Sequence, residues 1–198
     1  MRLTIIRHGI TSGNILNQHI GTTDIPLAAE GEELARKTSK FLGKYDAYYC
    51  SPMLRTRQTA ALLFPGKTVT PFDGFQERDF GEYEGKTHTE LAGDPFYAEW
   101  VQDQISAPPG GESVDMLTKR CGKALERLLS DAEARHASNI VLVTHGNVIR
   151  ALMSHYTSLG IPFRDWLTEN CGGWVVNVGR SPVMFEIAED RRKGWLNS

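Results

Sequence analysis

Two histidines of this chain close local sequences of the same design. The segments Leu3–Gly9 and Ile140–Gly146 each carry an apolar run rich in β-branched residues that ends in His-Gly, with the histidines at His8 and His145. Such a run, bounded by a turn residue, predicts a buried strand, so each histidine lies just past a strand's carboxyl end. Open α/β sheets place their ligand sites at that end of the strands. The pair therefore indicates a site built from two strand ends.

A single histidine at a strand end is most often a half-buried side chain without a chemical role. Two further features favour a site here. A glycine follows each histidine, which lets the backbone turn sharply and a ligand approach closely. Arg7 precedes His8, and an arginine is a poor choice for the end of an apolar strand unless its charge is used.

Several chemistries that use histidine or a related nucleophile can be separated by their spacing. The sequence contains no H-E-x-x-H or H-x-H pattern and no close set of acidic residues and cysteines beside the two histidines, so we expect no metal site. The P-loop, the dinucleotide-binding glycine pattern and the G-x-S-x-G motif of serine hydrolases are also absent, and we expect no cofactor. What remains is phosphoryl transfer, in which a neutral imidazole nitrogen attacks phosphorus.

Cys121 and Arg127 satisfy the Cys-x5-Arg spacing of cysteine-dependent phosphatases. In those enzymes a loop must present successive backbone N–H groups to a phosphate. The leucine periodicity around Cys121 predicts a long helix instead, whose N–H groups are already bonded. We therefore expect Cys121 to pack in the core.

Phosphoryl transfer spreads negative charge over the equatorial oxygens of its transition state, so guanidinium groups are the expected stabilisers. Arg7 is adjacent to His8. Arg55 and Arg57 follow a second predicted strand, residues 47–50, at the start of a predicted helix. For Arg57 we favour a solvated helix face.

Several sequence blocks of this chain resemble those of a known family. The segment Arg7–Asn14 resembles the R-H-G-x-[TS]-x-x-N signature of the histidine phosphatase superfamily, which includes cofactor-dependent phosphoglycerate mutases and many small phosphatases. R-H-G alone is a weak signal, whereas blocks in family order over most of the chain are a strong one. The further blocks are Gly21–Leu27 with Gly31, Ser51–Arg55 with Gln58–Ala60, Glu77–Gly85, Pro109–Ser113 and Thr144–Gly146.

This resemblance implies roles for individual residues. His8 would be the nucleophile, and Glu77 matches the proton donor of the family. The chemistry needs such a donor because an alkoxide is a poor leaving group at neutral pH. Glu82 and Glu84 are rival candidates whose place in the block suggests a structural turn. The residues implied to hold the phosphoryl group or the substrate are Arg7, Asn14, Arg55, His145 and Gly146.

The resemblance also bears on the reaction. Asn147 stands where many phosphatases of the family have a second glycine and where the mutases commonly have asparagine. The short segment 85–108, however, lacks the paired arginines with which the mutases hold a second acidic group, and Pro108–Ser113 looks like the small phosphatases, including those acting on α-ribazole phosphate. The resulting hypothesis is a metal-independent phosphomonoesterase for a small phosphorylated metabolite, with α-ribazole 5′-phosphate as a candidate.

Two alternatives stay open. One is a cofactor-dependent phosphoglycerate mutase with the same site. The other is a non-catalytic protein of the same fold that binds a phosphorylated ligand; binding alone would not require both His8 and Glu77, which disfavours it.

The elements that must position these residues alternate between strand and helix, which predicts a three-layer α/β sandwich with a mostly parallel central sheet. By the resemblance, this fold is phosphoglycerate mutase-like. The expected strands are 3–8, 47–50, 68–70, 139–145, 174–178 and 183–187, the last two as a hairpin-like pair, and the expected helices are 30–42, 53–64, 94–102, a long one after Ser113 and one near 148–158.

The segment 72–111, rich in glycine and aromatic residues, is expected to be an insertion that covers the site. Its aromatic side chains either stack on a base or pack on an aliphatic part of the substrate, or they form ordinary core. These residues are Phe80, Tyr83, Phe96, Tyr97 and Trp100.

Composition limits the remaining classes. The 198 residues, with no linker or charge block, predict a single domain over 1–198, and a net charge of −2 without a basic cluster disfavours nucleic acid. No apolar run approaches membrane-spanning length, and the chain opens directly on a strand, without room for a signal peptide. Three widely spaced cysteines suit a reducing compartment, so we expect a cytoplasmic protein. The sequence leaves the oligomeric state open.

Overall fold

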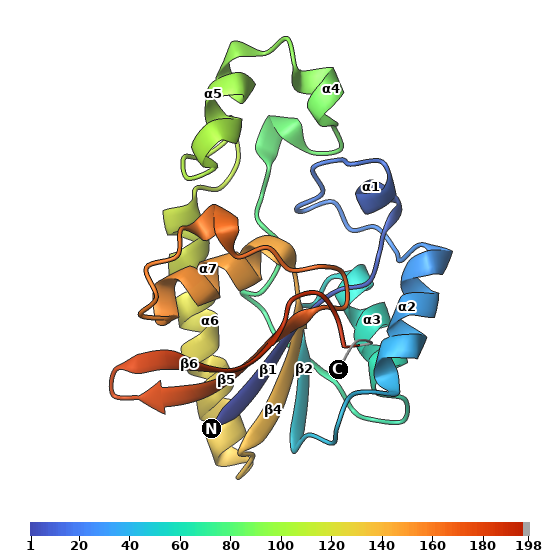
Figure 1. Ribbon diagram of the computed structural model, residues 1–198, viewed down its shortest axis with the longest axis vertical. Helices are drawn as coiled ribbons and strands as arrows, with labels where there is room; N and C mark the ends of the chain where they lie inside the picture. Colours follow the sequence, from blue (N-terminus) through green and yellow to red (C-terminus); the bar gives the residue numbers. More distant parts are fainter. Residues whose placement is uncertain (196–198) are drawn as a thin grey trace.

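The computed structural model describes residues 1–195 and contains a six-stranded mixed sheet between two layers of helices (Figure 1). The strand order is β3-β2-β4-β1-β5-β6. The first four strands are parallel, whereas β5 runs antiparallel to β1 and forms a hairpin with β6. This is the mostly parallel α/β sandwich that the sequence predicts. The strands are β1 (Arg2–Arg7), β2 (Ala47–Cys50), β3 (Thr70–Pro71), β4 (Asn139–Thr144), β5 (Gly173–Arg180) and β6 (Val183–Arg191).

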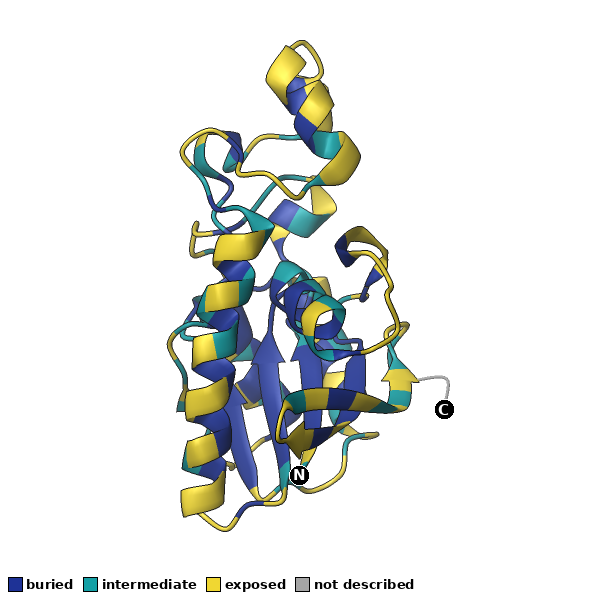
Figure 2. Cartoon of the chain, turned by 90° about the vertical axis from the view of Figure 1, so that its left-hand side faces the viewer, coloured by how far each residue is buried: buried dark blue, intermediate teal, exposed yellow. Residues whose placement is uncertain are grey.

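The central strands are apolar on both faces because helices cover both faces. Successive side chains of a strand point to opposite sides, so Ile5 packs into the cluster beneath one helix layer and Ile6 into the cluster beneath the other. Neither side chain is exposed to solvent. Figure 2 shows the central strands as the most continuously buried part of the molecule.

One face of the sheet carries α6 (Val114–Ala134) and α7 (Gly146–Tyr156), and the other carries α2 (Ala29–Ser39) and α3 (Leu54–Leu63). The hydroxyl of Ser113 caps α6 by accepting the backbone N–H of Met116. The buried residues of α6 recur at helical spacing, and its opposite face is exposed (Figure 2). This helix is the long one predicted from its leucine periodicity.

Several predicted bounds were wrong by a few residues. The helix expected over 30–42 ends at Ser39, and Phe41 beyond it is 49% exposed, so no core contact continues the helix. The helix expected near 148–158 begins at Gly146, because His145 is its N-cap, and ends at Tyr156. The strand expected over 68–70 is the two-residue β3. The helix α1 (Ser12–Ile15) and the 3-10 turn η2 (Phe163–Asp165) were not expected.

The segment 72–111, which we call the cap, stands beyond the carboxyl ends of the parallel strands (Figure 1). It contains η1 (Gly81–Tyr83), α4 (His88–Leu91) and α5 (Pro95–Asp103); the first two were missed by the sequence analysis. Most of its aromatic side chains pack against one another in a small core of their own, whereas Phe96 is 71% exposed. The members of this core are Phe80, Tyr83, Leu91, Tyr97 and Trp100.

None of the helices in residues 1–195 combines the length and the apolar character needed to cross a bilayer.

Candidate active site

The two histidines meet because their strands are neighbours. Strands β1 and β4 pair in parallel with Arg7 opposite Thr144, so His8 and His145 leave the sheet side by side. The His8 backbone N–H donates to the Thr144 carbonyl at 2.9 Å, and the two imidazole centroids are 5.3 Å apart. Both side chains are buried. The structure thus brings together the two residues that the matching His-Gly segments singled out.

In the described part of the chain, the hydrogen bonds of His8 leave one ring nitrogen without a partner. Its Nδ1 lies 2.7 Å from the carbonyl oxygen of Gly9, and since a carbonyl only accepts, Nδ1 carries the hydrogen. Burial, reinforced by the positive charges of Arg7 and Arg55, holds the pKa of His8 well below its ordinary value. The imidazole is therefore neutral at pH 7, and Nε2 keeps the lone pair that a nucleophile needs.

His145 has the opposite arrangement. Its Nδ1 accepts from Nε of Arg55 at 3.3 Å, so its Nε2 carries the hydrogen and donates to the Ser51 hydroxyl at 2.8 Å. Burial and then the charge of Arg55 hold the pKa of His145 well below its ordinary value. Ser51 was not singled out from the sequence, although it directly follows the predicted strand 47–50 and the strand-end argument applies to it equally.

Arg55 is 1% exposed and is fixed by a neighbouring loop. Its Nη1 and Nη2 donate to the carbonyls of Thr23 and Gly21, at 3.0 and 2.8 Å. Arg57 stands two positions further along α3, a spacing that points its side chain away from that of Arg55, and it is exposed. The solvated face expected for Arg57 is confirmed.

Arg7 keeps an unused donor. Its Nη1 donates to the Thr168 carbonyl at 2.7 Å, while its buried Nε has no hydrogen-bond partner within residues 1–195. Gly146, the first residue of α7, lies beside this guanidinium, at a distance where a Cβ would be in ordinary van der Waals contact with Nε. The N-terminus of α7 and Arg7 therefore face the same space with positive potential.

Asn14 lies at the edge of this space and belongs to the capping box of α1. Its Oδ1 accepts from the Thr11 backbone N–H and from Nδ2 of Asn170, so its own amide N–H groups are left for a ligand. Asn170 also donates to the carbonyls of His8 and Gly9. No pattern in the sequence pointed to Asn170, which reaches the site from the loop before β5.

Glu77 is a buried carboxylate on the cap side of the site. It accepts the backbone N–H of Arg78 at 2.8 Å and that of Asn147, near the start of α7, at 3.3 Å. Behind it, Arg120 donates to the carbonyl of Gln76 and pairs with the carboxylate of Glu112. The segment that carries Glu77 is therefore held rigidly against α6.

The two rival carboxylates lie elsewhere. Glu84 accepts the backbone N–H groups of Gly21, Thr22 and Thr23, so it holds the loop that also binds Arg55. Glu82 is exposed. The structural role suggested for both by their place in the sequence block agrees with this geometry.

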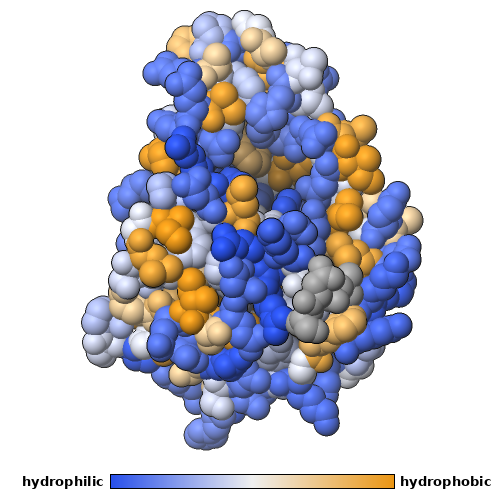
Figure 3. Space-filling view, viewed as in Figure 1, coloured by the Kyte–Doolittle hydropathy of each residue, from blue (hydrophilic) through white to orange (hydrophobic). Residues whose placement is uncertain are grey.

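These side chains enclose a small cavity of about 120 Å³, which is bordered by His8, Asn14, Arg55 and Phe80 and by Arg7, Glu77 and Asn147. The last three residues also border a larger cavity of about 1080 Å³. Figure 3 shows the surface hollowed between the cap and the sheet, with hydrophilic residues around the hollow. A phosphoryl group fits the first space by its size and charge, and the second is within the range of pockets that hold a whole small molecule.

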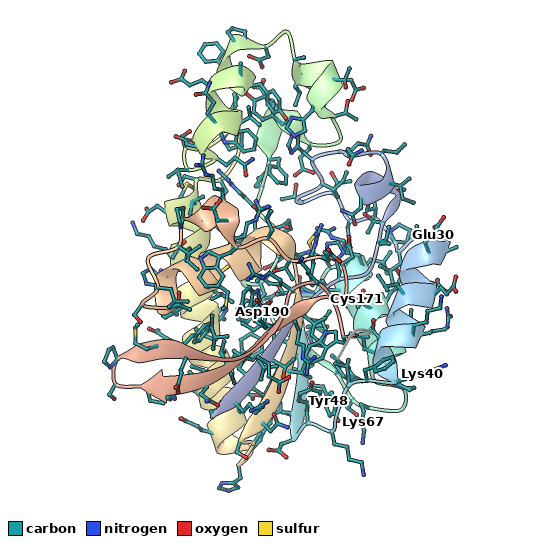
Figure 4. All side chains as sticks on the ribbon, in the orientation of Figure 1. Glu30, Lys40, Tyr48, Lys67, Cys171 and Asp190 are labelled. Carbon is teal, nitrogen blue, oxygen red and sulfur yellow. The ribbon has the colours of Figure 1, made fainter. Side chains whose placement is uncertain are left out.

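Other polar groups near the site are less suited to chemistry. Cys171, labelled in Figure 4, donates its backbone N–H to the Arg7 carbonyl, and burial raises the pKa of its thiol to about 12. Cys121 lies in the middle of α6 with its side chain buried in the main core, as predicted, and burial raises the pKa of its thiol to about 12. Across residues 1–195, no group of three or more His, Cys, Asp or Glu side chains is placed to hold a metal ion.

Comparison with known proteins gives a consistent result. The family described as the histidine phosphatase superfamily, branch 1, matches residues 3–181. The adenosylcobalamin/alpha-ribazole phosphatase of Escherichia coli is 31% identical over the whole of both chains, and an acid phosphatase of Mycobacterium tuberculosis is 31% identical over 80% of this chain and 76% of its own. The crystal structure of a phosphoserine phosphatase of Entamoeba histolytica, in complex with 3-phosphoglyceric acid, superposes with a TM-score of 0.83 at 27% identity, covering 98% of each chain.

Proposed function

This chain belongs to branch 1 of the histidine phosphatase superfamily and is a phosphatase of that family, and from this premise we propose that it hydrolyses small phosphate monoesters through a phosphohistidine at His8, without a metal ion. The observation that carries the proposal is that, within residues 1–195, neither Nε2 of the neutral His8 nor the neighbouring Nε of Arg7 has a hydrogen-bond partner. A nucleophile and an unused cationic donor face the same phosphoryl-sized cavity.

In the first step, Nε2 of His8 attacks phosphorus and forms an N–P bond. The bond from phosphorus to the ester oxygen breaks, and its electron pair leaves with that oxygen. Glu77, entering as the carboxylic acid, donates its proton to the oxygen, so an alcohol departs rather than an alkoxide. His8 Nδ1 retains its hydrogen and its bond to the Gly9 carbonyl, which orients the ring throughout.

The charge that develops on the phosphoryl oxygens is met by donors already in place. Arg7, through its free Nε, and Arg55 supply guanidinium N–H groups, and Asn14 supplies amide N–H groups. The backbone at Gly146 adds the positive end of α7. His145 completes the set as a neighbour of the His8 ring, held by Ser51 and Arg55.

In the second step, Glu77 is a carboxylate and takes a proton from a water molecule. The water oxygen attacks phosphorus, the N–P bond breaks, and its electron pair returns to Nε2 of His8. Inorganic phosphate then leaves, with Glu77 protonated for the next cycle. The same carboxyl group thus serves as acid and as base.

For the substrate we propose a small phosphorylated metabolite. α-Ribazole 5′-phosphate is supported by the activity for which the Escherichia coli relative is named, and 3-phosphoglycerate by the ligand bound in the Entamoeba histolytica structure. These two molecules differ in the charge of the group that leaves.

The test is a panel of phosphate monoesters that includes both compounds, assayed for inorganic phosphate, together with rapid quenching of labelled substrate. We expect phosphate release and an acid-labile, base-stable label on His8. Label on serine or cysteine overturns the mechanism. Transfer of phosphate to a second hydroxyl without release indicates the mutase, and binding without any turnover indicates the non-catalytic alternative.

A chelator provides a separate test, because arginines and the α7 N-terminus supply the positive charge that a metal supplies in other phosphatases. Incubation with excess EDTA is expected to leave kcat and KM unchanged. If activity falls with EDTA and returns with a divalent cation, the proposed chemistry at this site is wrong.

A further inference from the structure

Three further arginines lie close enough to Glu77 to feel its charge, and their hydrogen bonds differ. Arg78 donates from Nε, Nη1 and Nη2 to three backbone carbonyls at 2.6 to 2.7 Å. Arg120 pairs with the carboxylate of Glu112. Both guanidinium groups are thus satisfied by the protein.

Arg150, on α7, is not satisfied in this way. Within residues 1–195 its hydrogen bonds come from Nη1 alone and reach the side-chain oxygens of Gln104 and Asn147 at 3.4 and 3.5 Å, the long limit of a hydrogen bond. Its guanidinium carbon also lies 5.9 Å from the centroid of the Phe163 ring, which supplies no anion. Its Nε and Nη2 have no partner, and its guanidinium has no carboxylate within ion-pair distance, among the residues that the structure describes. The side chain is half-buried rather than exposed.

A half-buried guanidinium without an anion is costly. Burial lowers the pKa of Arg150, and the more distant charges of Glu77 and Asp165 offset this only in part. Nε and Nη2 together form the side of the guanidinium that matches the two oxygens of a carboxylate. The unused donors therefore have the geometry of a carboxylate receptor.

The position of Arg150 relates it to the leaving group. It borders the larger cavity, which shares Arg7, Glu77 and Asn147 with the phosphoryl-sized one. Arg150 follows Gly146 by four residues, so both lie on the same face of α7. In the proposed reaction Glu77 protonates the leaving oxygen, which places the leaving group on the side of Glu77 that opens toward Arg150.

Of the other cationic side chains at this cavity, Arg191 and Arg192 are held in ion pairs and Lys193 is exposed. Arg191 and Arg192 pair with the carboxylates of Glu189 and Asp190, and Asp190 is labelled in Figure 4. Asp165 and Glu169 add negative charge to the cavity wall. A singly charged group is therefore accommodated there more readily than a second phosphate dianion.

We propose that Arg150 binds a carboxylate on the leaving group, so that small phosphorylated carboxylic acids are the preferred substrates over phosphate esters of uncharged alcohols. This inference rests on the proposed function and adds the substrate class. It ranks 3-phosphoglycerate above α-ribazole 5′-phosphate, whose leaving group is uncharged.

The experiment measures competition against p-nitrophenyl phosphate, so that a compound need not itself be turned over. Two matched pairs are compared: phosphoglycolate with 2-hydroxyethyl phosphate, and 3-phosphoglycerate with glycerol 3-phosphate. In each pair a carboxylate replaces a hydroxymethyl group. The proteins are the wild type, Arg150→Met, Arg150→Lys and Arg164→Met. Arg164, which is exposed and donates to the Gln102 carbonyl, controls for the loss of a nearby positive charge.

In the wild type we expect the acid of at least one pair to compete about 10-fold to 100-fold more strongly than its alcohol, the usual worth of a hydrogen-bonded charge. Arg150→Met should abolish this ratio, Arg150→Lys should restore part of it, and Arg164→Met should leave it intact. The ratio within one variant is insensitive to a general loss of folded protein, which lowers the rates with both compounds equally.

Other outcomes overturn the inference. A wild-type ratio near one for both pairs, or a ratio that survives Arg150→Met, excludes a carboxylate receptor at Arg150 while p-nitrophenyl phosphate hydrolysis keeps the proposed function intact. Absence of any p-nitrophenyl phosphate hydrolysis by the folded wild type instead removes the proposed function, and this inference with it.

Discussion

The sheet end and the cap both contain a buried arginine, Arg55 and Arg78, but they use their polar groups differently. In the cap, Arg78 gives all three of its nitrogens to backbone carbonyls, and Glu84 accepts from a run of backbone N–H groups. At the sheet end, Arg7 leaves Nε without a partner within residues 1–195, and His8 leaves Nε2 free. Polar groups that stabilise the fold are saturated, whereas groups that face a ligand keep spare capacity.

The contrast extends to the aromatic residues. Four of those in the cap, Phe80, Tyr83, Tyr97 and Trp100, pack against one another in one cluster, and Phe80 also borders the phosphoryl-sized cavity. The cap thus contributes mainly a wall and the Glu77 carboxylate, and the sheet end contributes the nucleophile and the donors. Substitutions at the sheet end and at Glu77 should therefore change rates, and substitutions elsewhere in the cap should change stability.

The largest effect is expected for His8→Ala, because the nucleophile is lost. We expect kcat for p-nitrophenyl phosphate to fall by at least about four orders of magnitude, as for other nucleophile deletions. His88→Ala, which alters an exposed histidine of the cap, should change kcat less than about twofold. If His8→Ala kept a tenth of the wild-type rate, His8 would not be the nucleophile, and the contrast between a reactive sheet end and a structural cap would be wrong.

Glu77→Gln is next. An unactivated alkyl phosphate needs the proton that Glu77 donates, so its hydrolysis should slow by about two to four orders of magnitude. A nitrophenyl ester needs no acid in the first step, and stopped-flow measurement should show a burst of nitrophenol followed by a slow steady state.

Glu84→Gln serves as the matched cap variant for this prediction. It removes the carboxylate that accepts the backbone N–H groups of the loop Gly21–Thr23. The substitution should lower the melting temperature without producing a burst. If Glu77→Gln slows both esters equally and shows no burst, Glu77 positions the site and does not move protons.

Arg78→Met tests how much the hydrogen bonds within the cap contribute to stability. It leaves three backbone carbonyls, those of Gln104, Ser106 and Glu112, without their charged donor. We expect the free energy of unfolding to fall by about 3 kcal/mol. Urea denaturation measures this, with Arg57→Met as an exposed control expected to change it by less than about 0.5 kcal/mol. An equal loss in both variants would show that the saturated contacts contribute little.

The smallest expected effect concerns the free energy of unfolding at acidic pH. Burial holds the pKa of His8 and His145 well below the ordinary 6.5 and lowers that of His19 to about 4. In the unfolded chain each returns to about 6.5, so below that pH the unfolded state binds more protons than the folded state. The stability that these neutral histidines confer is complete above pH 6.5 and declines as the pH falls toward their lowered values.

His19→Gln removes one of the groups that take up a proton on unfolding. It should therefore reduce the slope of the unfolding free energy against pH, on the acid side, by up to about 1.4 kcal/mol per pH unit. Urea titrations at several pH values between 7.5 and 4.5 measure the slope. His155→Gln is the control, since that ring is exposed and is not among the groups that shift the pKa of His19. An unchanged slope in His19→Gln would show that His19 is not buried in its neutral form in solution.

A site residue could be predicted from the sequence where its position follows from the strand or helix that carries it. His8 and His145 follow apolar strands, and parallel strands align their carboxyl ends, so their meeting needed no further information. Arg55 and Arg57 were separable in the same way, because helix geometry turns residues two apart in different directions.

Other parts of the site depend on tertiary contacts that leave no local signal. Asn170 reaches His8 from a loop whose sequence shows no periodicity, and Arg150 is distinguished by the partners it lacks, which only the packed structure reveals. The cap helix α4 is four residues long, too short for a helical period, although its capping box at Thr87 and Glu90 was visible.

The loop Gly21–Thr23 is held between opposite charges from the two regions. Arg55 donates to its carbonyls from the sheet end, and Glu84 accepts its N–H groups from the cap. An opening motion that detaches the cap from this loop must therefore give up charge-assisted bonds together with the restraint on Arg55. Local unfolding of the cap and loosening of the phosphate clamp are one cooperative event, and a phosphate that tightens Arg55 stabilises the closed cap by the same free energy with which the closed cap favours the phosphate.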